Sequence, residues 1–400
     1  MAEHTAQRHR SYLRDRQDED SARVSFAELF FDLVFVFAVT QLSQYLLNHL
    51  EAEGVFRGSV LFMATWWLWI TTSWATNRLD PDRSLVRMLI FALMVVGLPF
   101  AISIPLAYEG LGLLFAVTYV AMQLGRSVFM VWALKDEDDG QRATFERVSI
   151  WFVISGVLWI TGGFLDGDLR SALWTVALML DIGVPWMGFW VPGHGRSPAS
   201  EWDIEGEHLA ERCALFIIIG LGESLLVTGQ RMATLEWDAV TMTAFAVALA
   251  GSLVMWWIYF DEGAKRGTEA IERSADPGRL ARFAYTYVHL PIVAGIVLSA
   301  VGDKLLLAHP EDTPGLASTL VLLGGPAVFL AGNFLFKDAT SHRWPVSHLI
   351  GLIALAAALP VAGLFSTLGL AAYATAALVA VAVLERLLRR SRAGARSLIE

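Results

Sequence analysis

The sequence predicts an all-α, polytopic membrane protein that crosses the bilayer about twelve times. Of its 400 residues, 55% are hydrophobic and only 17% are charged, and the mean hydropathy is +0.51. Soluble domains carry about 25% charged residues, so this composition indicates a chain that lies largely in lipid. Apolar runs that match the hydrocarbon thickness, about 17–25 residues each, recur along the whole chain.

The predicted spans follow one another with short connections. They cover residues 26–47, 58–76, 88–107, 111–133, 148–165, 171–190, 209–229, 238–260, 283–301, 315–335, 344–364 and 367–386. The last two run together through LPVAGLFSTLGL. A hairpin is expected there, because Pro and Gly favour a turn and a single helix of that length would exceed the bilayer. No cleavable signal peptide is predicted, since residues 1–24 contain charges throughout and no apolar stretch.

The distribution of basic residues predicts that both termini are cytoplasmic. With that orientation, nearly all of the 30 Lys and Arg residues fall in segments on the inside. The predicted location is the plasma (inner) membrane, with a cytoplasmic N-terminal tail over 1–24 and a C-terminal tail over 389–400. The basic residues left in outside loops are Arg57, Arg170, Arg231 and Lys304.

Internal similarity predicts two six-helix halves. ELFFDLVFVFAVTQL, which begins at Glu28, resembles ERCALFIIIGLGESL, which begins at Glu211, and three further pairs of segments match in the same order. Since each half begins on the cytoplasmic side, the halves are expected to be parallel repeats related by an axis along the membrane normal. The first repeat is expected over 25–192 and the second over 208–388, with a cytoplasmic linker over 193–207.

The first span begins with two carboxylates. Ser25 and Glu28 are predicted to form a capping box, in which each side chain bonds the other's backbone amide, so Glu28 has a structural explanation. Asp32 lies one turn deeper on the same helix face, past the amides that need caps. Ionisable residues inside a span are costly and usually face the bundle interior or a water-filled cavity. Asp32 is therefore interpreted either as a transport carboxylate or as the partner of a basic residue such as Arg87.

Glu223 lies in the middle of the seventh predicted span, after Gly220 and Gly222. Glycines beside a buried carboxylate permit close helix packing or a local break in the helix, and either arrangement builds a polar pocket. Arg212 is roughly 16 Å away along the helix axis and cannot neutralise Glu223. The alternative is a protonated Glu223 that hydrogen-bonds to a neighbouring helix.

At the start of the same span, His208, Glu211 and Arg212 are spaced to form a local polar cluster. Other polar residues within spans are Arg126, Asp181, His289, Asn333 and His348. Arg126 is a candidate partner for a buried acid, Asp181 a substrate or proton site, and the two histidines proton carriers. Each of these side chains has the simpler alternative of an interhelical hydrogen bond.

Several chemistries are excluded by what the sequence lacks. The single cysteine, Cys213, cannot form an intramolecular disulfide or a Cys-x-x-Cys site. GxxxxGK[ST] and HExxH are both missing, which argues against ATP-driven transport and zinc proteolysis. No catalytic residue, metal ligand, cofactor or nucleic-acid partner is predicted. The expected partners are the lipid bilayer and a small solute or ion, and a homo-oligomer is a further expectation.

SFAELFFDLVFVFAVTQLS together with ERCALFIIIGLGESLL resembles the bacterial low-temperature-requirement A (LtrA) family of multi-pass membrane proteins. The hallmarks are an ELF[FY]DL opening of the first helix and an ER…LGES segment midway, here Glu211-Arg212 and residues 221–224. The resemblance implies the multi-pass fold and brings no biochemical activity. A weaker similarity links the segment from Arg23 to Asp32 to the lysosomal potassium-channel family, although the spacing here is longer and Leu215 replaces the second acid.

The pattern of buried acids favours a secondary transporter or permease, with Asp32, Glu223 and Asp181 around a central cavity. An ion channel built from six-helix repeats would use the same helices to line a pore. A membrane-embedded sensor or enzyme is the third alternative, and the sequence favours a protein without enzymatic activity.

Overall fold

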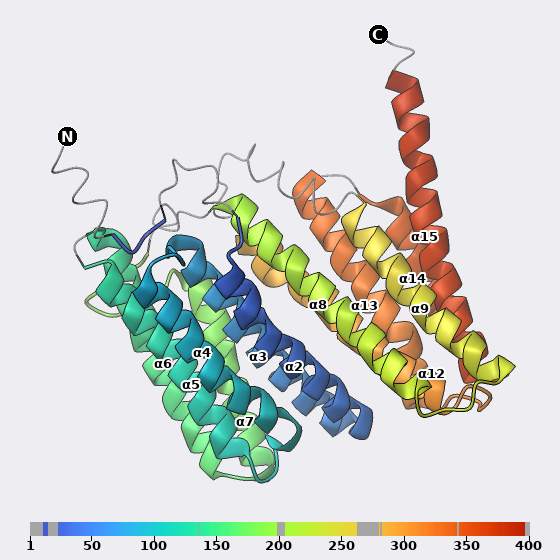
Figure 1. Cartoon of the computed structure of the whole chain (residues 1–400), viewed down its shortest axis with the longest axis horizontal. Helices are drawn as coiled ribbons and strands as arrows, with labels where there is room; N and C mark the ends of the chain where they lie inside the picture. Colours follow the sequence, from blue (N-terminus) through green and yellow to red (C-terminus); the bar gives the residue numbers. More distant parts are fainter. Residues whose placement is uncertain are drawn as a thin grey trace. The chain divides into compact units, whose positions relative to one another are not determined.

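The computed structural model describes residues 11–14, 23–135, 137–197, 205–261, 280, 282–341 and 344–396. Within these residues the chain forms twelve α-helices, short 3₁₀ and π segments and two isolated β-bridges, but no strand (Figure 1). Two compact units divide the chain. The N-terminal unit comprises Met1–Tyr45 and Glu53–Arg212, and the C-terminal unit comprises Leu46–Ala52 and Cys213–Glu400.

The N-terminal unit contains six helices and the beginning of a seventh. They are α2 (Phe26–Asn48), α3 (Ala52–Arg78), α4 (Ser84–Ser103), α5 (Gly112–Ala133), α6 (Asp139–Phe164), α7 (Gly167–Gly183) and the first turns of α8 (Gly206–Met232). The 3₁₀ turns η2 (Ile104–Leu106) and η3 (Val184–Met187) extend α4 and α7. Helix α5 packs against α4 and α6, and α6 against α7.

The C-terminal unit begins inside α8 and contains the remaining helices. These are α9 (Ala239–Phe260), α12 (His289–Ala308), α13 (Leu316–Ser341), α14 (Val346–Ala358) and α15 (Thr367–Arg396). The π-helix η5 (Arg282–Val288) leads into α12, and the 3₁₀ turn η6 (Leu359–Leu364) follows α14. Helix α15 packs along α9 and also contacts α13 and α14 (Figure 1). Lys337 on α13 holds both carboxylate oxygens of Glu385 on α15, at 2.7 and 2.9 Å.

Helices α12 and α13 approach each other through glycines. A Cβ atom added to Gly325 would lie 2.7 Å from the backbone nitrogen of Ser299, and one added to Gly332 would lie 2.7 Å from that of Ile292. Small residues allow such close contact between helix backbones in membranes, where packing replaces the hydrophobic effect as the driving force. The two helices therefore form the tightest described contact of the C-terminal unit.

Among the described residues, ten helical segments are long and apolar enough to cross a membrane. Each of the twelve predicted runs contains a helix, but α3 and α7 are not among the ten. Helix α7 has only 17 residues. Helix α3 carries many Trp, Thr and Ser side chains, which neighbouring helices bury. The structure thus confirms an all-helical, multi-pass architecture, and the six-helix repeat stays a prediction.

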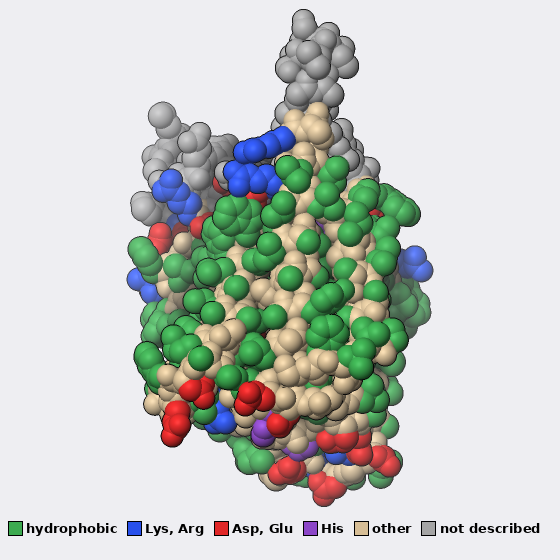
Figure 2. Space-filling model, turned by 90° about the vertical axis from the view of Figure 1, so that its right-hand side faces the viewer, with side chains coloured by type: hydrophobic (Ala, Val, Ile, Leu, Met, Phe, Trp, Pro, Cys, Tyr) green, Lys and Arg blue, Asp and Glu red, His purple; other side chains and the backbone are tan. Residues whose placement is uncertain are grey.

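Hydrophobic side chains cover the outside of the helices. Figure 2 shows one such face, with a broad apolar band, Asp and Glu side chains gathered below it and Lys and Arg more frequent above it. On α9, α14 and α15, large apolar residues such as Leu253, Ile353 and Val383 are more than half exposed. A soluble monomer rarely exposes apolar surface of this extent, so the band is suited to contact with lipid.

Candidate functional site

The predicted capping box is present at the start of α2. The Glu28 amide donates to Ser25 Oγ at 3.3 Å, and the Ser25 amide donates to Glu28 Oε2 at 3.0 Å. The Glu28 carboxylate has further partners, because Arg14 Nη2 donates to it at 2.9 Å and His208 Nε2 lies 3.1 Å away. Arg212 Nη1 lies 3.2 Å from Oε1 of Glu28. Glu28 is therefore both a helix cap and the centre of a buried set of charges.

Asp32 is also part of this set. Arg212 Nη2 donates to its carboxylate at 2.6 Å, and Trp69 Nε1 donates to the same oxygen at 2.9 Å. The predicted pairing of Asp32 with Arg87 is wrong: Arg87 contacts Asp82 at 3.3 Å on the surface. A charge as deeply buried as Asp32 requires a close counter-charge, and α8 provides one. The residues Arg14, Glu28, Asp32, His208 and Arg212 are called the ionic cluster below.

The ionic cluster is closed by the described N-terminal segment, residues 11–14. Leu13 forms a β-bridge with Leu79, and the Arg14 amide donates to the Arg78 carbonyl at 2.9 Å. Arg14 Nε donates to the carbonyls of Thr76 and Leu79 at 3.1 and 3.0 Å. These bonds place the guanidinium of Arg14 against Glu28, with its side chain 6% exposed.

The predicted local cluster of His208, Glu211 and Arg212 is not formed. Glu211 accepts a hydrogen bond from the Val24 amide at 3.0 Å, whereas His208 and Arg212 reach Glu28. His208 Nδ1 lies 3.2 Å from Asn77 Nδ2, and His208 Nε2 lies 3.1 Å from both Glu28 Oε1 and Arg14 Nη2. The three side chains on the first turns of α8 thus bind partners from elsewhere in the N-terminal unit.

Asp181 lies in a separate buried network of the same unit. Its Oδ2 accepts from the Tyr119 hydroxyl and from Trp159 Nε1, each at 2.9 Å. Gln123 Nε2 donates to Tyr119, and Arg126 donates to Gln123 Oε1. Arg126 was a candidate partner for a buried acid, and among the described contacts it reaches Asp181 through Gln123 and Tyr119. Large aromatic side chains fill the space around Asp181.

Glu223 pairs with a lysine of α12. Lys304 Nζ lies 3.4 Å from Glu223 Oε1. Next to this pair, Ser224, which follows Glu223, bonds Asp303, which precedes Lys304: Ser224 Oγ donates to Asp303 Oδ2 at 2.5 Å and lies 3.1 Å from Ser252 Oγ. Two acids, one lysine and two hydroxyls from α8, α9 and α12 are thereby brought together inside the C-terminal unit.

The two glycines before Glu223 have different surroundings. A Cβ atom on Gly220 would lie 3.2 Å from Ile296 Cγ2, whereas one on Gly222 would meet nothing within 4 Å. Helix α8 continues through both positions without a break. Gly220 therefore permits the close packing that the sequence predicted, and Gly222 does not contribute to it.

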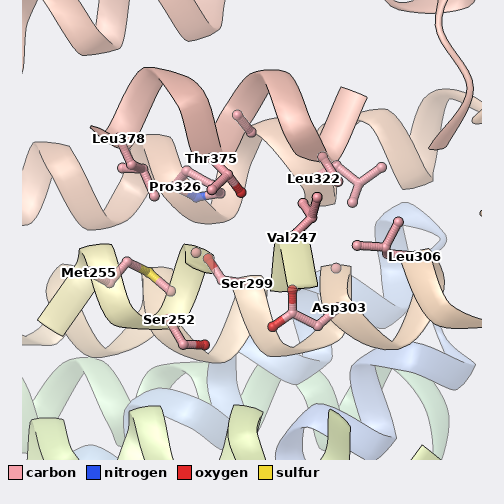
Figure 3. A pocket seen from close by; sticks show the side chains of 14 residues that line it. Val247, Ser252, Met255, Ser299, Asp303, Leu306, Leu322, Pro326, Thr375 and Leu378 are labelled. Atoms are coloured by element: carbon pink, nitrogen blue, oxygen red, sulfur yellow. The ribbon is translucent and has the colours of Figure 1, made fainter. Parts of the chain in front are cut away.

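A cavity of about 40 Å³ lies between α9, α12, α13 and α15 (Figure 3). A buried water needs about 10–15 Å³ by this measure, so the cavity has room for two or three water-sized groups. Asp303 is the single charged side chain among the described residues that line it. The remaining lining is apolar apart from the backbone and the hydroxyl groups of Ser252, Ser299 and Thr375.

The other predicted polar candidates make interhelical or local hydrogen bonds. The fully buried His289 lies 2.8 Å from both the Tyr259 hydroxyl and the Ala284 carbonyl, which the π-helix presents. Asn333 Nδ2 donates to the Phe329 carbonyl at 2.9 Å, and His348 Nδ1 lies 3.2 Å from Ser347 Oγ. Cavity-lining residues do not include His289, Asn333 or His348.

Sequence reasoning missed Asp303 and Lys304. The ninth predicted span ends at residue 301, where these two charges interrupt the apolar run, so Lys304 was placed in an outside loop. The structure continues α12 to Ala308 and pairs both charges with α8. The leucines of LLLA after the charges were the available signal, since they extend the apolar pattern by one more turn.

No metal centre of the usual kind is found in the part of the chain that the structure describes. Groups of three or more His, Cys, Asp or Glu side chains placed to hold one ion do not occur there. The candidate site is therefore a single carboxylate with hydroxyl groups at a small cavity, beside a Glu–Lys ion pair.

Spanning helices, apolar outer faces and buried charges together define a multi-pass membrane protein. The chain belongs to the bacterial low temperature requirement A (LtrA) protein family, whose model matches residues 23–383. An uncharacterized protein of Rhizobium meliloti (strain 1021) is 42% identical to it over 394 residues, which cover 97% of this chain and 96% of the relative. No solved structure matches the chain.

Proposed function

We propose that this protein is a secondary transporter or permease whose solute-binding site is the cavity at Asp303. The observation that supports this function is a carboxylate on the wall of a cavity inside an apolar helix bundle. Ionisable residues at such positions in membrane proteins commonly mark substrate or ion pathways. Secondary transporters place their sites between helices in this way.

The ionic cluster is less suited to transport. Asp32 and Glu28 contact arginines, a histidine and a tryptophan at hydrogen-bond distance, and both acids are at most 1% exposed. Removing either acid from its arginine would leave a buried unpaired charge, which is very costly. These contacts support a structural role for Asp32, which is the second of the two interpretations that its position in the sequence allowed.

Glu223 stays a transport candidate because of its neighbours. It precedes Ser224, which bonds Asp303, and its partner Lys304 follows Asp303. Any solute that bonds Asp303 in place of Ser224 would therefore affect the region of the Glu223–Lys304 pair. A ligand shifts a conformational equilibrium only through such differential contacts. In this proposal Asp303 binds the solute and Glu223–Lys304 responds to its presence.

Proteoliposomes that carry the purified protein test this function. Uptake of inorganic ions and small solutes would be measured for wild type, Asp303→Asn and Glu223→Gln, with Asp238→Asn, an exposed helix-cap variant, as the matched control. Saturable wild-type uptake that is lost in Asp303→Asn and kept in Asp238→Asn is expected. The proposal fails if wild type moves none of the solutes, or if folded Asp303→Asn transports as well as wild type.

We also propose an inner-membrane location with both termini cytoplasmic, on the evidence of the Lys and Arg distribution. Reporter fusions at residue 400 and in the connection after residue 235 would check it. A cytoplasm-active reporter should work at the first position and fail at the second, and the reverse result would contradict the orientation.

A further inference from the structure

We propose that the cavity binds one monovalent alkali cation through the Asp303 carboxylate. This inference rests on the proposed transport site at the same place and adds the chemical class of its ligand. Charge, ligand chemistry and size each support it.

The carboxylate of Asp303 gives the wall of the cavity one negative charge, which one positive charge would balance. Asp303 is the only charged group among the described lining residues. Lys304, its neighbour in sequence, is directed to Glu223, with Nζ 3.4 Å from Oε1, and those two opposite charges form a pair of their own. A carboxylate in apolar surroundings is unfavourable unless a proton or a bound cation neutralises it. A monovalent cation does so, whereas a divalent ion would leave a surplus positive charge.

The lining supplies neutral oxygen ligands from several helices. Hydroxyl groups come from Ser252 on α9, Ser299 on α12 and Thr375 on α15 (Figure 3). Ser299 Oγ donates its proton to the Gly295 carbonyl at 2.8 Å, so its lone pairs remain available to a cation. Ser224 donates to Oδ2 of Asp303 and holds the carboxylate in place. Oxygen ligands of this kind suit hard cations and disfavour soft metals.

A proline in α13 removes the usual helical donor from a backbone carbonyl of a residue that lines the cavity. Pro326 lies within the helix and has no N–H, so the carbonyl of Leu322, four residues earlier, lacks the donor that an α-helix normally provides. Both residues line the cavity. Backbone carbonyls released from helical bonding are typical cation ligands in transporters.

The size of the cavity restricts the ligand further. About 40 Å³ holds a bare alkali cation with one or two waters. The space beside the carboxylate is thus matched to a small inorganic ion.

Thermal unfolding of the purified full-length protein in detergent tests the inference. Tm would be measured at constant ionic strength and neutral pH in sodium, potassium, lithium or choline chloride, and binding of radioactive sodium by a scintillation proximity assay. A ligand that binds only the folded state raises Tm in a saturable manner. We expect this rise with at least one alkali cation over choline, its loss in Asp303→Asn and its retention in Asp238→Asn.

Two results would overturn the inference: an equal Tm in all four salts, or the same cation effect in Asp303→Asn. If Asp303→Asn does not elute as a folded protein, Ser252→Ala and Thr375→Ala take its place, and each should weaken the cation effect. Cation-dependent stabilisation without liposome uptake would uphold the binding site and reject transport. Solute uptake without any effect of alkali cations on Tm or on the uptake rate would uphold the transport function and reject the cation site.

Discussion

The guanidinium of Arg212 lies 2.6 Å from the carboxylate of Asp32, although 180 residues separate them in the chain. The same side chain is 3.2 Å from Glu28 and lies over the Trp69 ring, 5.7 Å from its centroid. Its exposed fraction is 0%. One arginine thus neutralises two carboxylates and joins the start of α8 to α2 and α3 within the N-terminal unit.

Replacing Arg212 should destabilise the protein strongly. Arg212→Gln leaves Asp32 without its cation and Glu28 with one fewer, and breaking a buried ion pair costs about 3–5 kcal/mol. The free energy of unfolding in detergent would measure this loss. Asp32→Asn should recover part of it when combined with Arg212→Gln. The matched control is Arg87→Gln, whose exposed pair with Asp82 is worth about 0–1 kcal/mol. Equal losses in the two arginine variants would contradict a structural ionic cluster.

The bonds of Arg14 predict a protected N-terminal segment. In Arg14→Ala the Leu13–Leu79 bridge would lose the side-chain bonds that accompany it, and chymotrypsin should cleave faster after Tyr12. Time-resolved proteolysis with mass spectrometry would follow this cleavage. Arg142→Ala, which removes a half-exposed surface pair with Glu146, is the control and should leave the rate unchanged. Identical rates for both variants would show that Arg14 does not hold the segment.

Two glycine substitutions should have opposite effects. In Gly332→Ala the new methyl group would overlap the backbone of Ile292, and such overpacking costs about 1–3 kcal/mol. In Gly222→Ala it would meet open space within a helix, where alanine is stabilising by about 0.4–1 kcal/mol. Thermal unfolding of both variants measures the difference. A Gly332→Ala protein as stable as Gly222→Ala would mean that α12 and α13 pack less closely than described.

Asp238 should stabilise α9 in a pH-dependent way. The Thr241 amide donates to its carboxylate at 2.7 Å, and this bond at the exposed helix N-cap lowers the pKa of Asp238 below its ordinary value. A carboxylate with a depressed pKa contributes its full stabilisation above the unfolded-state value and loses it as pH falls through the folded-state value. Asp238→Ala should therefore lower Tm equally at about pH 7 and pH 5, and by less at about pH 3. A Tm difference that is independent of pH would rule out the charged cap.

The helices were predictable because apolar length is a local property of the sequence. All twelve predicted runs contain helices, since every spanning backbone must satisfy its own hydrogen bonds. Composition could not show that α3 lies within a bundle, because tryptophans such as Trp66 and Trp69 are also typical of the membrane interface. Burial by neighbouring helices decided their role.

The contacts of the candidate site were predictable only where they are local. The Ser25–Glu28 box follows from a spacing of three residues on one helix. The partner of Asp32 could not be found from spacing. The helical pattern shows which side chains lie on the same face of one helix, but it does not show which distant helix packs against that face. Asp303 was missed for another reason. The predicted span stops where Asp303 and Lys304 interrupt the apolar residues, but the helix itself continues to Ala308.

The glycine contact between α12 and α13 has a mechanical consequence. Backbones that touch at Gly325 and Gly332 cannot slide or separate without losing most of their packing, so the two helices move as one body. Helix α15 is anchored to α13 by Lys337–Glu385, and Thr375 lies ten residues earlier, roughly 15 Å along its axis. The start of α15 is held as well, because the Leu368 amide donates to the Pro310 carbonyl at 2.9 Å and the Tyr373 hydroxyl donates to the Ala354 carbonyl at 2.8 Å. The helices α12, α13 and α15 are therefore expected to move together.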